Sequence, residues 1–150
     1  PKLNYCLDTL LLGFLNLIDK GRKETGEGVR DFLSVLSKMG FLIFASSGNN
    51  TERVRKLLEE TGIANHFTSI IGFDKIPKSE HIPYFAKILR LPIERFTESC
   101  LYFGDSPSDI IIAKKWKAYP IGVQDSIKPI FLSRAGAREI INFKEISPAI

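Results

Sequence analysis

Two aspartates, Asp105 and Asp109, follow an apolar, aromatic run in a pattern that suits metal or phosphate chemistry. The run, Leu101 to Phe103, predicts a buried strand that ends at Gly104, and the apolar spacing after Asp109 predicts a helix. Two carboxylates on one short turn repel each other unless a positive charge lies between them, and Mg²⁺ prefers such oxygen ligands. The turn therefore has two open interpretations: a divalent cation site, or a helix-capping aspartate followed by a second, exposed acid.

Three other predicted strands also end in polar residues. They are followed by Asp8 after Leu3 to Leu7, by Ser46 and Ser47 after Phe41 to Ala45, and by Lys78 shortly after Phe67 to Ile71. Because parallel strands end at one edge of a sheet, and ligands bind at that edge, we expect these groups to converge. Paired acids that hold Mg²⁺, a lysine that neutralises phosphate oxygens and a hydroxyl that donates to them suit phosphoryl transfer.

Predicted helices alternate with the predicted strands along the chain. They cover Val29 to Met39, Thr51 to Gly62, Tyr84 to Leu89, Ile110 to Lys117 and Ile127 to Ala135, and a fifth strand runs from Tyr119 to Val123. The polar segment from Lys20 to Gly26 predicts a loop. This alternation predicts an α/β fold with a doubly wound parallel sheet, helices on both faces and three layers. We expect residues 1–150 to form one domain.

Composition argues against several classes of function. The 150-residue chain has a formal net charge of +4, but its basic residues are scattered, so we expect no nucleic-acid partner. No apolar run reaches the ~20 residues that span a bilayer, so we expect no membrane partner. Cys6 and Cys100 both lie inside apolar runs, which favours a reduced, cytoplasmic setting over a disulfide framework. The oligomeric state stays open.

The motifs resemble those of the haloacid dehalogenase-like (HAD) superfamily of phosphohydrolases, from about Leu3 to Val123. Gly104-Asp105-Ser106-Pro107-Ser108-Asp109 is similar to its acidic G-D-x-x-x-D motif, Phe41 to Ser47 to its second motif, and Lys78 to its lysine motif. Tyr5-Cys6-Leu7-Asp8-Thr9-Leu10 resembles an altered version of its first motif, aromatic-D-x-D-x-T-L. The short segments between these motifs are similar to those of capless, magnesium-dependent members, which have no large cap domain.

This resemblance implies a Mg²⁺-dependent phosphatase that hydrolyses phosphate monoesters through an aspartyl-phosphate-type mechanism. It implies that Asp8, Lys78 and Ser46 are catalytic, that Ser46, Ser47 and Lys78 bind the substrate phosphate, and that Asp8, Asp105 and Asp109 hold Mg²⁺. The implied partner is a small phosphorylated substrate or a phosphoprotein.

The first motif departs from the family pattern because it holds a single acid. If Asp8 fills the second, acid/base position, Cys6 stands in the place of the nucleophile; if Asp8 fills the first, Leu10 replaces the acid/base. The preceding Tyr5 and Cys6 favour the former assignment, and a thiol is a poor Mg²⁺ ligand. Two hypotheses follow: a phosphatase with a degraded first motif, and a catalytically impaired pseudo-phosphatase that binds a phosphorylated ligand or a protein partner.

Overall fold

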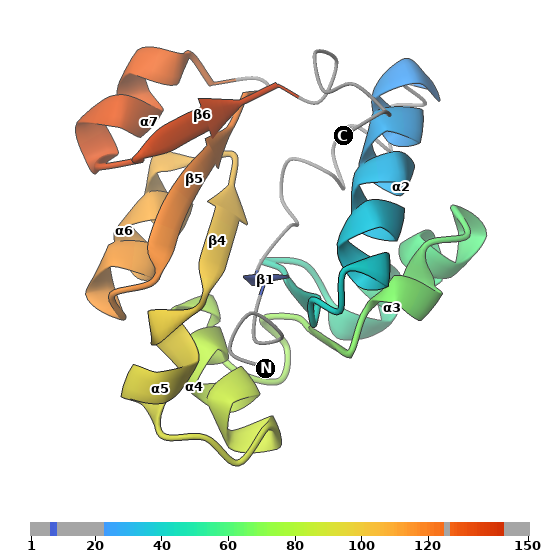
Figure 1. Ribbon diagram of the computed structural model, residues 1–150, viewed down its shortest axis with the longest axis horizontal. Coiled ribbons are helices and arrows are strands. Elements are labelled where there is room, and N and C mark those ends of the chain that lie inside the picture. The colour runs from blue at the N-terminus through green and yellow to red at the C-terminus, as the bar shows by residue number, and fades with distance from the viewer. Residues whose placement is uncertain (1–6, 9–22, 125–126, 143–150) are drawn as a thin grey trace.

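The computed structural model of the protein describes residues 7–8, 23–124 and 127–142, in which helices and strands alternate (Figure 1). The helices are α2 (Lys23–Lys38), α3 (Thr51–Glu60), α4 (His81–Ile88), α5 (Ile93–Glu98), α6 (Pro107–Lys115) and α7 (Pro129–Ala135). Two 3-10 helices are η2 (Ala64–His66) and η3 (Lys78–Glu80). The strands are β1 (Leu7–Asp8), β2 (Phe44–Ser46), β3 (Ser69–Ile71), β4 (Leu101–Gly104), β5 (Tyr119–Val123) and β6 (Glu139–Ile141).

Every strand pair in the described ranges is parallel. One sheet has the order β1-β4-β5-β6, and β2 and β3 form a second, two-stranded sheet. Strand β1 also contacts β2, so it lies where the two sheets meet. Within each sheet, paired strands end side by side: Ser46 lies opposite Ile71, and Gly104 lies opposite Gly122. The polar residues that follow these strands therefore begin from neighbouring strand ends.

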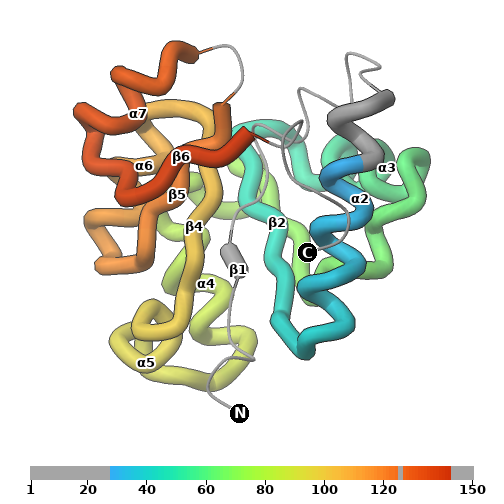
Figure 2. Tube along the Cα trace, turned by 45° about the horizontal axis from the view of Figure 1, so that its top comes forward, coloured from blue at the N-terminus to red at the C-terminus, as the bar shows by residue number. Residues whose placement is uncertain are grey.

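Buried hydrophobic side chains form two clusters, one on each face of the strands. Successive residues of a strand enter different clusters: Ala45 joins the first and Phe44 the second, and Phe103 and Tyr102 divide in the same way. Side chains alternate between the two faces along a strand, so the division means that helices cover both faces. Helices α2 and α3 contribute to the first cluster, and α4, α5 and α6 contribute to the second. Figure 2 shows α2 and α3 on one side of the strands, and α6 and α7 on the other. The predicted α/β fold, with parallel strands between helical layers, is confirmed, and the described strands form two sheets where the sequence predicted one.

Helix α2 begins earlier than the sequence predicted. Its first turns include Gly26, which we expected in a loop, and Gly28. Val29 and Leu33 are fully buried in the first cluster, so tertiary contacts outweigh the low helix propensity of the two glycines. The prediction that Met39 lies on the buried face is wrong: α2 ends before it, and its side chain is 63% exposed.

Two further elements had no clear signal in the sequence. Helix α5 begins after Pro92 and buries Phe96 in the second cluster. Strand β6 pairs with β5 in register, with Glu139 opposite Ile121, and extends the sheet at its outer edge. Both elements are short, which gives hydrophobic periodicity few residues in which to appear.

The sequence predicted no membrane-spanning segment. In the part of the chain that the structure describes, no helix combines the length and the apolar composition needed to cross a bilayer.

Candidate functional site

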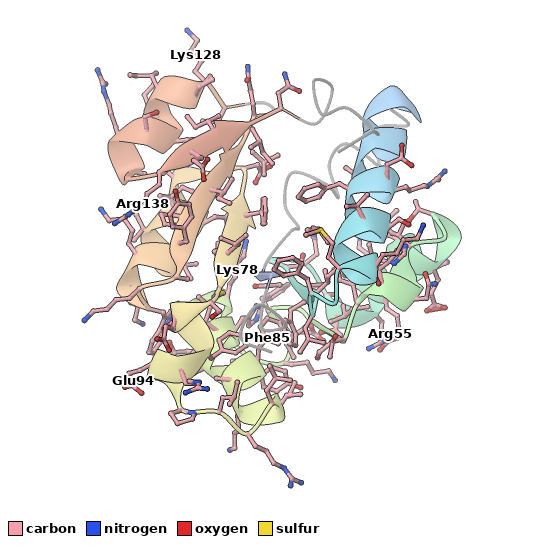
Figure 3. All side chains as sticks on the ribbon, in the orientation of Figure 1. Arg55, Lys78, Phe85, Glu94, Lys128 and Arg138 are labelled. Carbon is pink, nitrogen blue, oxygen red and sulfur yellow. The ribbon has the colours of Figure 1, made fainter. Side chains whose placement is uncertain are left out.

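A buried ion pair joins the lysine after β3 to the acidic turn after β4. The Nζ atom of Lys78, at the start of η3, lies 2.5 Å from Oδ1 of Asp109 in the first turn of α6. The Asp109 side chain is 1% exposed and the Lys78 side chain 15%. Lys78 lies in the interior of the view in Figure 3, whereas Lys128 and Arg138 lie at the periphery. For Asp109, the neutralising positive charge is therefore supplied by the chain itself.

The second carboxylate oxygen of Asp109 holds the start of α6. Oδ2 accepts hydrogen bonds from the backbone N–H of Ser106 (3.2 Å) and from its hydroxyl (2.9 Å). The Ser106 hydroxyl oxygen also accepts from the Asp109 backbone N–H (3.4 Å), which completes a capping box with Pro107 in the first turn. The helix cap is thus a serine. The acid one turn further on, which one interpretation of the sequence took as exposed, is buried.

Gly104 makes room for the Asp109 carboxylate. A Cβ atom at residue 104 would lie 2.2 Å from Cβ of Asp109 and 2.8 Å from its Cγ. Non-bonded carbon atoms do not approach so closely, so any side chain at this position would move Asp109. The absence of a side chain at Gly104 is therefore a condition for the ion pair with Lys78.

Helix α6 and its C-cap residue, Trp116, hold η3 at two further points. Nε1 of Trp116 donates a hydrogen bond to the carbonyl oxygen of Ser79 (2.7 Å), and Nζ of Lys115 lies 3.2 Å from Oε2 of Glu80. The Lys115 and Glu80 side chains are about half exposed, so water screens that pair and it contributes little. Three successive residues of η3 nevertheless contact α6 or its C-cap Trp116, which fixes Lys78 opposite Asp109.

Ser46, at the end of β2, contacts a histidine that sequence reasoning missed. Its Oγ lies 2.6 Å from Nδ1 of His81, the first residue of α4, and both residues are fully buried. The other ring nitrogen, Nε2, lies 2.8 Å from the carbonyl oxygen of Ile76. His81 follows Lys78 by one helical turn, so it links Ser46 to the segment that carries the lysine.

The electrostatic surroundings of His81 favour its neutral form. Burial lowers the pKa of His81, the hydrogen bond to the Ile76 carbonyl raises it, and the charge of Lys78 lowers it. Lys78 and His81 lie on η3 and α4, which adjoin in the chain and contact each other. The bonded pairs Ser46–His81 and Lys78–Asp109 are therefore carried by one continuous segment.

The turn after β2 is tied to the loop after β3. Oδ1 of Asp74 accepts hydrogen bonds from the backbone N–H (2.8 Å) and hydroxyl (2.6 Å) of Thr51, and these bonds lower the pKa of Asp74. The Thr51 oxygen accepts from the backbone N–H of Gly72 (2.8 Å). Ser47, the second predicted phosphate-binding hydroxyl, is fully buried, and its Oγ accepts from the Asn49 N–H (2.9 Å). The loops that flank Ser46 are therefore held in place.

The two remaining predicted residues are Asp105 and Asp8. Asp105 is 8% exposed and directly follows β4. Of Asp8 only the backbone is described, and it pairs with Tyr102, three residues before Asp105. At a rise of about 3.3 Å per residue, Asp8 lies about 10 Å short of Asp105 along the strand direction. Cys6 and Leu10 lie outside the described residues, so the role of the first motif stays a prediction.

A comparison with models of protein families gives a match over most of the chain. The matching family is that of the haloacid dehalogenase-like hydrolases, and the match spans residues 16–123. The chain belongs to this family. The matched range contains Ser46, Lys78, Asp105 and Asp109. It begins after Asp8 and does not cover the altered first motif.

Curated relatives of this haloacid dehalogenase-like chain include phosphoglycolate phosphatases. The enzyme of Vibrio cholerae is 29% identical over 115 residues, which cover 72% of this chain and 51% of the relative. The enzyme of Pseudomonas fluorescens is 36% identical over 92 residues, which cover 58% of this chain and 32% of the relative. The chain therefore spans about half, or less, of the length of these relatives.

Solved structures of the same kind share the fold. A predicted phosphatase from Clostridium acetobutylicum has a TM-score of 0.68 at 28% identity, covering 77% of this chain and 54% of that protein. A putative β-phosphoglucomutase from Thermotoga maritima has a TM-score of 0.69 at 20% identity, covering 79% of this chain and 56% of that protein. At the latter identity the likeness shows the fold alone.

Mg²⁺ is the metal that the haloacid dehalogenase-like motifs imply, and the donor chemistry of the site fits it in part. The carboxylates of Asp105 and Asp109 offer the hard oxygen atoms that Mg²⁺ prefers. Both oxygens of Asp109 already accept hydrogen bonds from Lys78 and Ser106, and no group of three or more His, Cys, Asp or Glu side chains is placed to hold a metal within the described ranges. Asp109 is therefore engaged by Lys78 and Ser106, and Asp105 is the other carboxylate that this turn offers.

We predict that Gly104→Ala lowers the free energy of unfolding by about 3 kcal/mol, because the new Cβ displaces Asp109 and separates it from Lys78. Gly48→Ala is the matched control, since a Cβ at Gly48 would meet nothing within 4 Å. For this control we expect a change below about 1 kcal/mol. Urea unfolding of both variants measures the difference, and equal stabilities would contradict the described contact.

Proposed function

We propose that this protein is a Mg²⁺-dependent phosphatase that hydrolyses small phosphate monoesters. The observation that carries the proposal is the buried Lys78–Asp109 ion pair, found in a chain of the haloacid dehalogenase-like hydrolase family. The pair puts a fixed positive charge beside the end of β4, and His81, three residues after Lys78, contacts the Ser46 hydroxyl at the end of β2. A phosphate group needs such a fixed cation and such donors.

Lys78 is the proposed centre of phosphate binding. An ammonium group has three N–H donors, and the ion pair with Asp109 uses one of them. The remaining exposure of its side chain, 15%, leaves part of it open to a ligand. In a site with little water, its charge interacts with phosphate oxygens more strongly than it would at the surface. The hydroxyls of Ser46 and Ser47 are the proposed further donors.

Asp105 is the proposed ligand of Mg²⁺, with Asp109 and Asp8 as the other carboxylates of the predicted set. Bound there, Mg²⁺ would neutralise charge on the phosphate oxygens. The chain's own residues do the rest: Lys78 orients the phosphate, and Asp109 and Ser106 hold Lys78 and the start of α6 in place.

Asp8 is the proposed catalytic carboxylate of the first strand. In an aspartyl-phosphate-type mechanism a carboxylate oxygen attacks phosphorus, the alcohol leaves with a proton, and water then hydrolyses the acyl phosphate. This mechanism needs two acids in the first motif, one as nucleophile and one as acid/base, and the sequence offers a single one. Turnover by this chain therefore depends on whether Asp8 and Cys6 together can supply the nucleophile and the acid/base.

The single acid in the first motif also favours a second candidate function. With Cys6 in the place of the nucleophile, the chain would bind a phosphorylated ligand or a protein partner without turning it over. Lys78, Ser46 and Asp105 would then keep their binding roles, because none of them depends on the first motif. The two candidates share the phosphate site and differ only in turnover.

The substrate class we propose is a small phosphorylated organic acid. The phosphoglycolate phosphatases similar to this chain act, by their name, on such a compound. We also propose that residues 1–150 form a single domain without a cap over the site. Such a site would be open to water and to bulky substrates.

We predict that the protein hydrolyses p-nitrophenyl phosphate in the presence of Mg²⁺, and that Asp105→Asn and Lys78→Met each lower kcat/KM at least about 100-fold. Asp105→Asn should also raise the Mg²⁺ concentration needed for half-maximal rate, because it removes a charged oxygen ligand. Steady-state kinetics across a range of Mg²⁺ concentrations gives both quantities.

Lys75→Met is the matched control for Lys78→Met, since Lys75 is an exposed lysine of the same loop. Its rate should stay within about twofold of the parent rate. Circular dichroism of each variant separates loss of folding from loss of chemistry. A parent rate that chelation of Mg²⁺ leaves unchanged would overturn the proposed mechanism.

A further prediction separates the two candidate functions. If Cys6 occupies the nucleophile position, Cys6→Asp should raise the rate of p-nitrophenyl phosphate hydrolysis at least about 100-fold, and Asp8→Asn in that background should remove the gain. No turnover in the parent together with this gain supports the binding function. A robust parent rate that Asp8→Asn does not change shows that Asp8 has no catalytic role.

A further inference from the structure

The hydrogen bonds of His81 fix the direction in which the Ser46 hydroxyl points. The carbonyl oxygen of Ile76 can only accept, so Nε2 of His81 carries a proton and donates to it across 2.8 Å. In a neutral imidazole the other nitrogen, Nδ1, then has a lone pair and no proton. Ser46 Oγ, 2.6 Å away, must donate its proton to Nδ1. In the free protein the Ser46 hydroxyl proton is therefore already in use.

A phosphate group at this site competes for the same proton. Phosphate oxygens accept hydrogen bonds, and a serine hydroxyl has one proton to donate. For Ser46 to donate to phosphate, its bond with His81 must reverse, so that Nδ1–H donates to Oγ. Because Nε2 remains protonated against the Ile76 carbonyl, this reversal requires a proton on both ring nitrogens.

We propose that His81 is a positioning residue that couples phosphate binding to proton uptake: a phosphate group binds Ser46 when Nδ1 of His81 gains a proton. This inference rests on the proposed function, because it requires a phosphate site at Ser46. The one covalent bond that forms is Nδ1–H, with a proton released by hydronium or a buffer acid. The Ser46 O–H bond stays intact and turns from the imidazole to a phosphate oxygen.

The groups around His81 set the balance between the two states. Lys78, from η3, is the charged group that acts on the ring, and Asp109 is the carboxylate that this network reaches, through Lys78. Strand β2 contributes the Ser46 hydroxyl, the loop after β3 contributes the backbone of Gly72 and Ile76, and α4 itself contributes the ring of Phe85. Helix α5 packs against α4 through the apolar side chain of Phe96.

These surroundings favour the neutral imidazole in the free protein. Burial lowers the pKa of His81. The hydrogen bond to the Ile76 carbonyl raises it, and the charge of Lys78 lowers it. A bound anion adds a negative charge and accepts the Ser46 hydrogen bond in place of Nδ1, and both changes favour the imidazolium. Linkage is reciprocal. If a bound anion raises the affinity of His81 for a proton, a proton on His81 raises the affinity of the site for the anion by the same factor.

The proposal predicts a pH dependence of anion affinity with a defined slope. If the anion binds only the state with protonated His81, its apparent Kd rises about tenfold per pH unit above the pKa of His81 in the free protein. Sulfate is a suitable probe, because it mimics phosphate and keeps its charge between about pH 5 and about pH 8. Titrations in chloride of matched ionic strength control for screening.

The chain offers a direct readout because it has only two histidines, His66 and His81. In the full chain, NMR of the imidazole signals follows the protonation of His81 with and without sulfate, while His66 serves as an internal reference. We expect the pKa of His81 to rise when sulfate is added, and the calorimetric Kd of sulfate to follow the slope above. These measurements use the parent protein, so they do not depend on whether a variant folds.

Three variants test the role of the Ser46–His81 bond. His81→Asn should make sulfate affinity independent of pH, because an amide does not titrate. Ser46→Ala removes the hydroxyl that must turn and should reduce the slope to less than half, leaving the purely electrostatic part. His66→Gln should keep the full slope.

The outcomes separate this inference from the proposed function. Saturable sulfate binding with a Kd that is flat across this pH range overturns the inference and leaves the phosphate site standing. Retention of the full slope in Ser46→Ala also overturns it, because the hydroxyl would then have no part in the coupling. An absence of saturable sulfate binding at every pH overturns the proposed phosphate site and this inference with it.

Discussion

The ion pair between Lys78 and Asp109 is the interaction on which the rest of the site depends. A carboxylate with 1% of its side chain exposed is costly unless its charge is neutralised and its oxygens accept hydrogen bonds. Asp109 meets both conditions, with the Lys78 ammonium on one oxygen and the Ser106 N–H and hydroxyl on the other. Without Lys78, Asp109 would be a buried, unpaired charge. Without Asp109, Lys78 would lose its counter-charge and α6 its capping box, so the two residues act as a unit.

The pair also explains why distant parts of the chain meet at one place. It ties the loop after β3 to the helix after β4, and the Trp116 hydrogen bond to Ser79 holds the same contact from further along α6. His81, one turn after Lys78, then reaches the Ser46 hydroxyl at the end of β2. The same contacts hold the fold together and place the groups of the proposed phosphate site, so the proposed function would depend on residues that also stabilise the fold.

Much of this arrangement could be predicted from the sequence, because it follows from strong periodicity and from the rule that parallel strands end together. The apolar runs at β2, β4 and β5 located the strand ends, and the order of Ser46, Lys78 and Asp105 then indicated one edge of the sheet. The capping box was also readable, since Ser106 and Asp109 have the spacing of that motif, but the two acids of the turn suggested a metal first.

Other features could not be predicted because their causes are tertiary. A single histidine at the start of an apolar helix has no spacing signal, so the contact of His81 with Ser46 appears only when β2 and α4 are placed together. Gly104 marked the end of a strand in the sequence, whereas its closeness to Asp109 is visible only in three dimensions. The first turns of α2 contain glycines and are helical because Val29 and Leu33 are anchored in the core.

The most direct test of this account is a double-mutant cycle on the ion pair, with Lys78→Met, Asp109→Asn and the double variant compared by urea unfolding. Because each single change leaves a buried group without its partner, each should lower the free energy of unfolding by about 3 kcal/mol, and the double variant should lose about 2 kcal/mol less than the sum of the two. Single losses that add to within about 0.5 kcal/mol would mean that Lys78 and Asp109 do not interact, and the account of this site would be wrong.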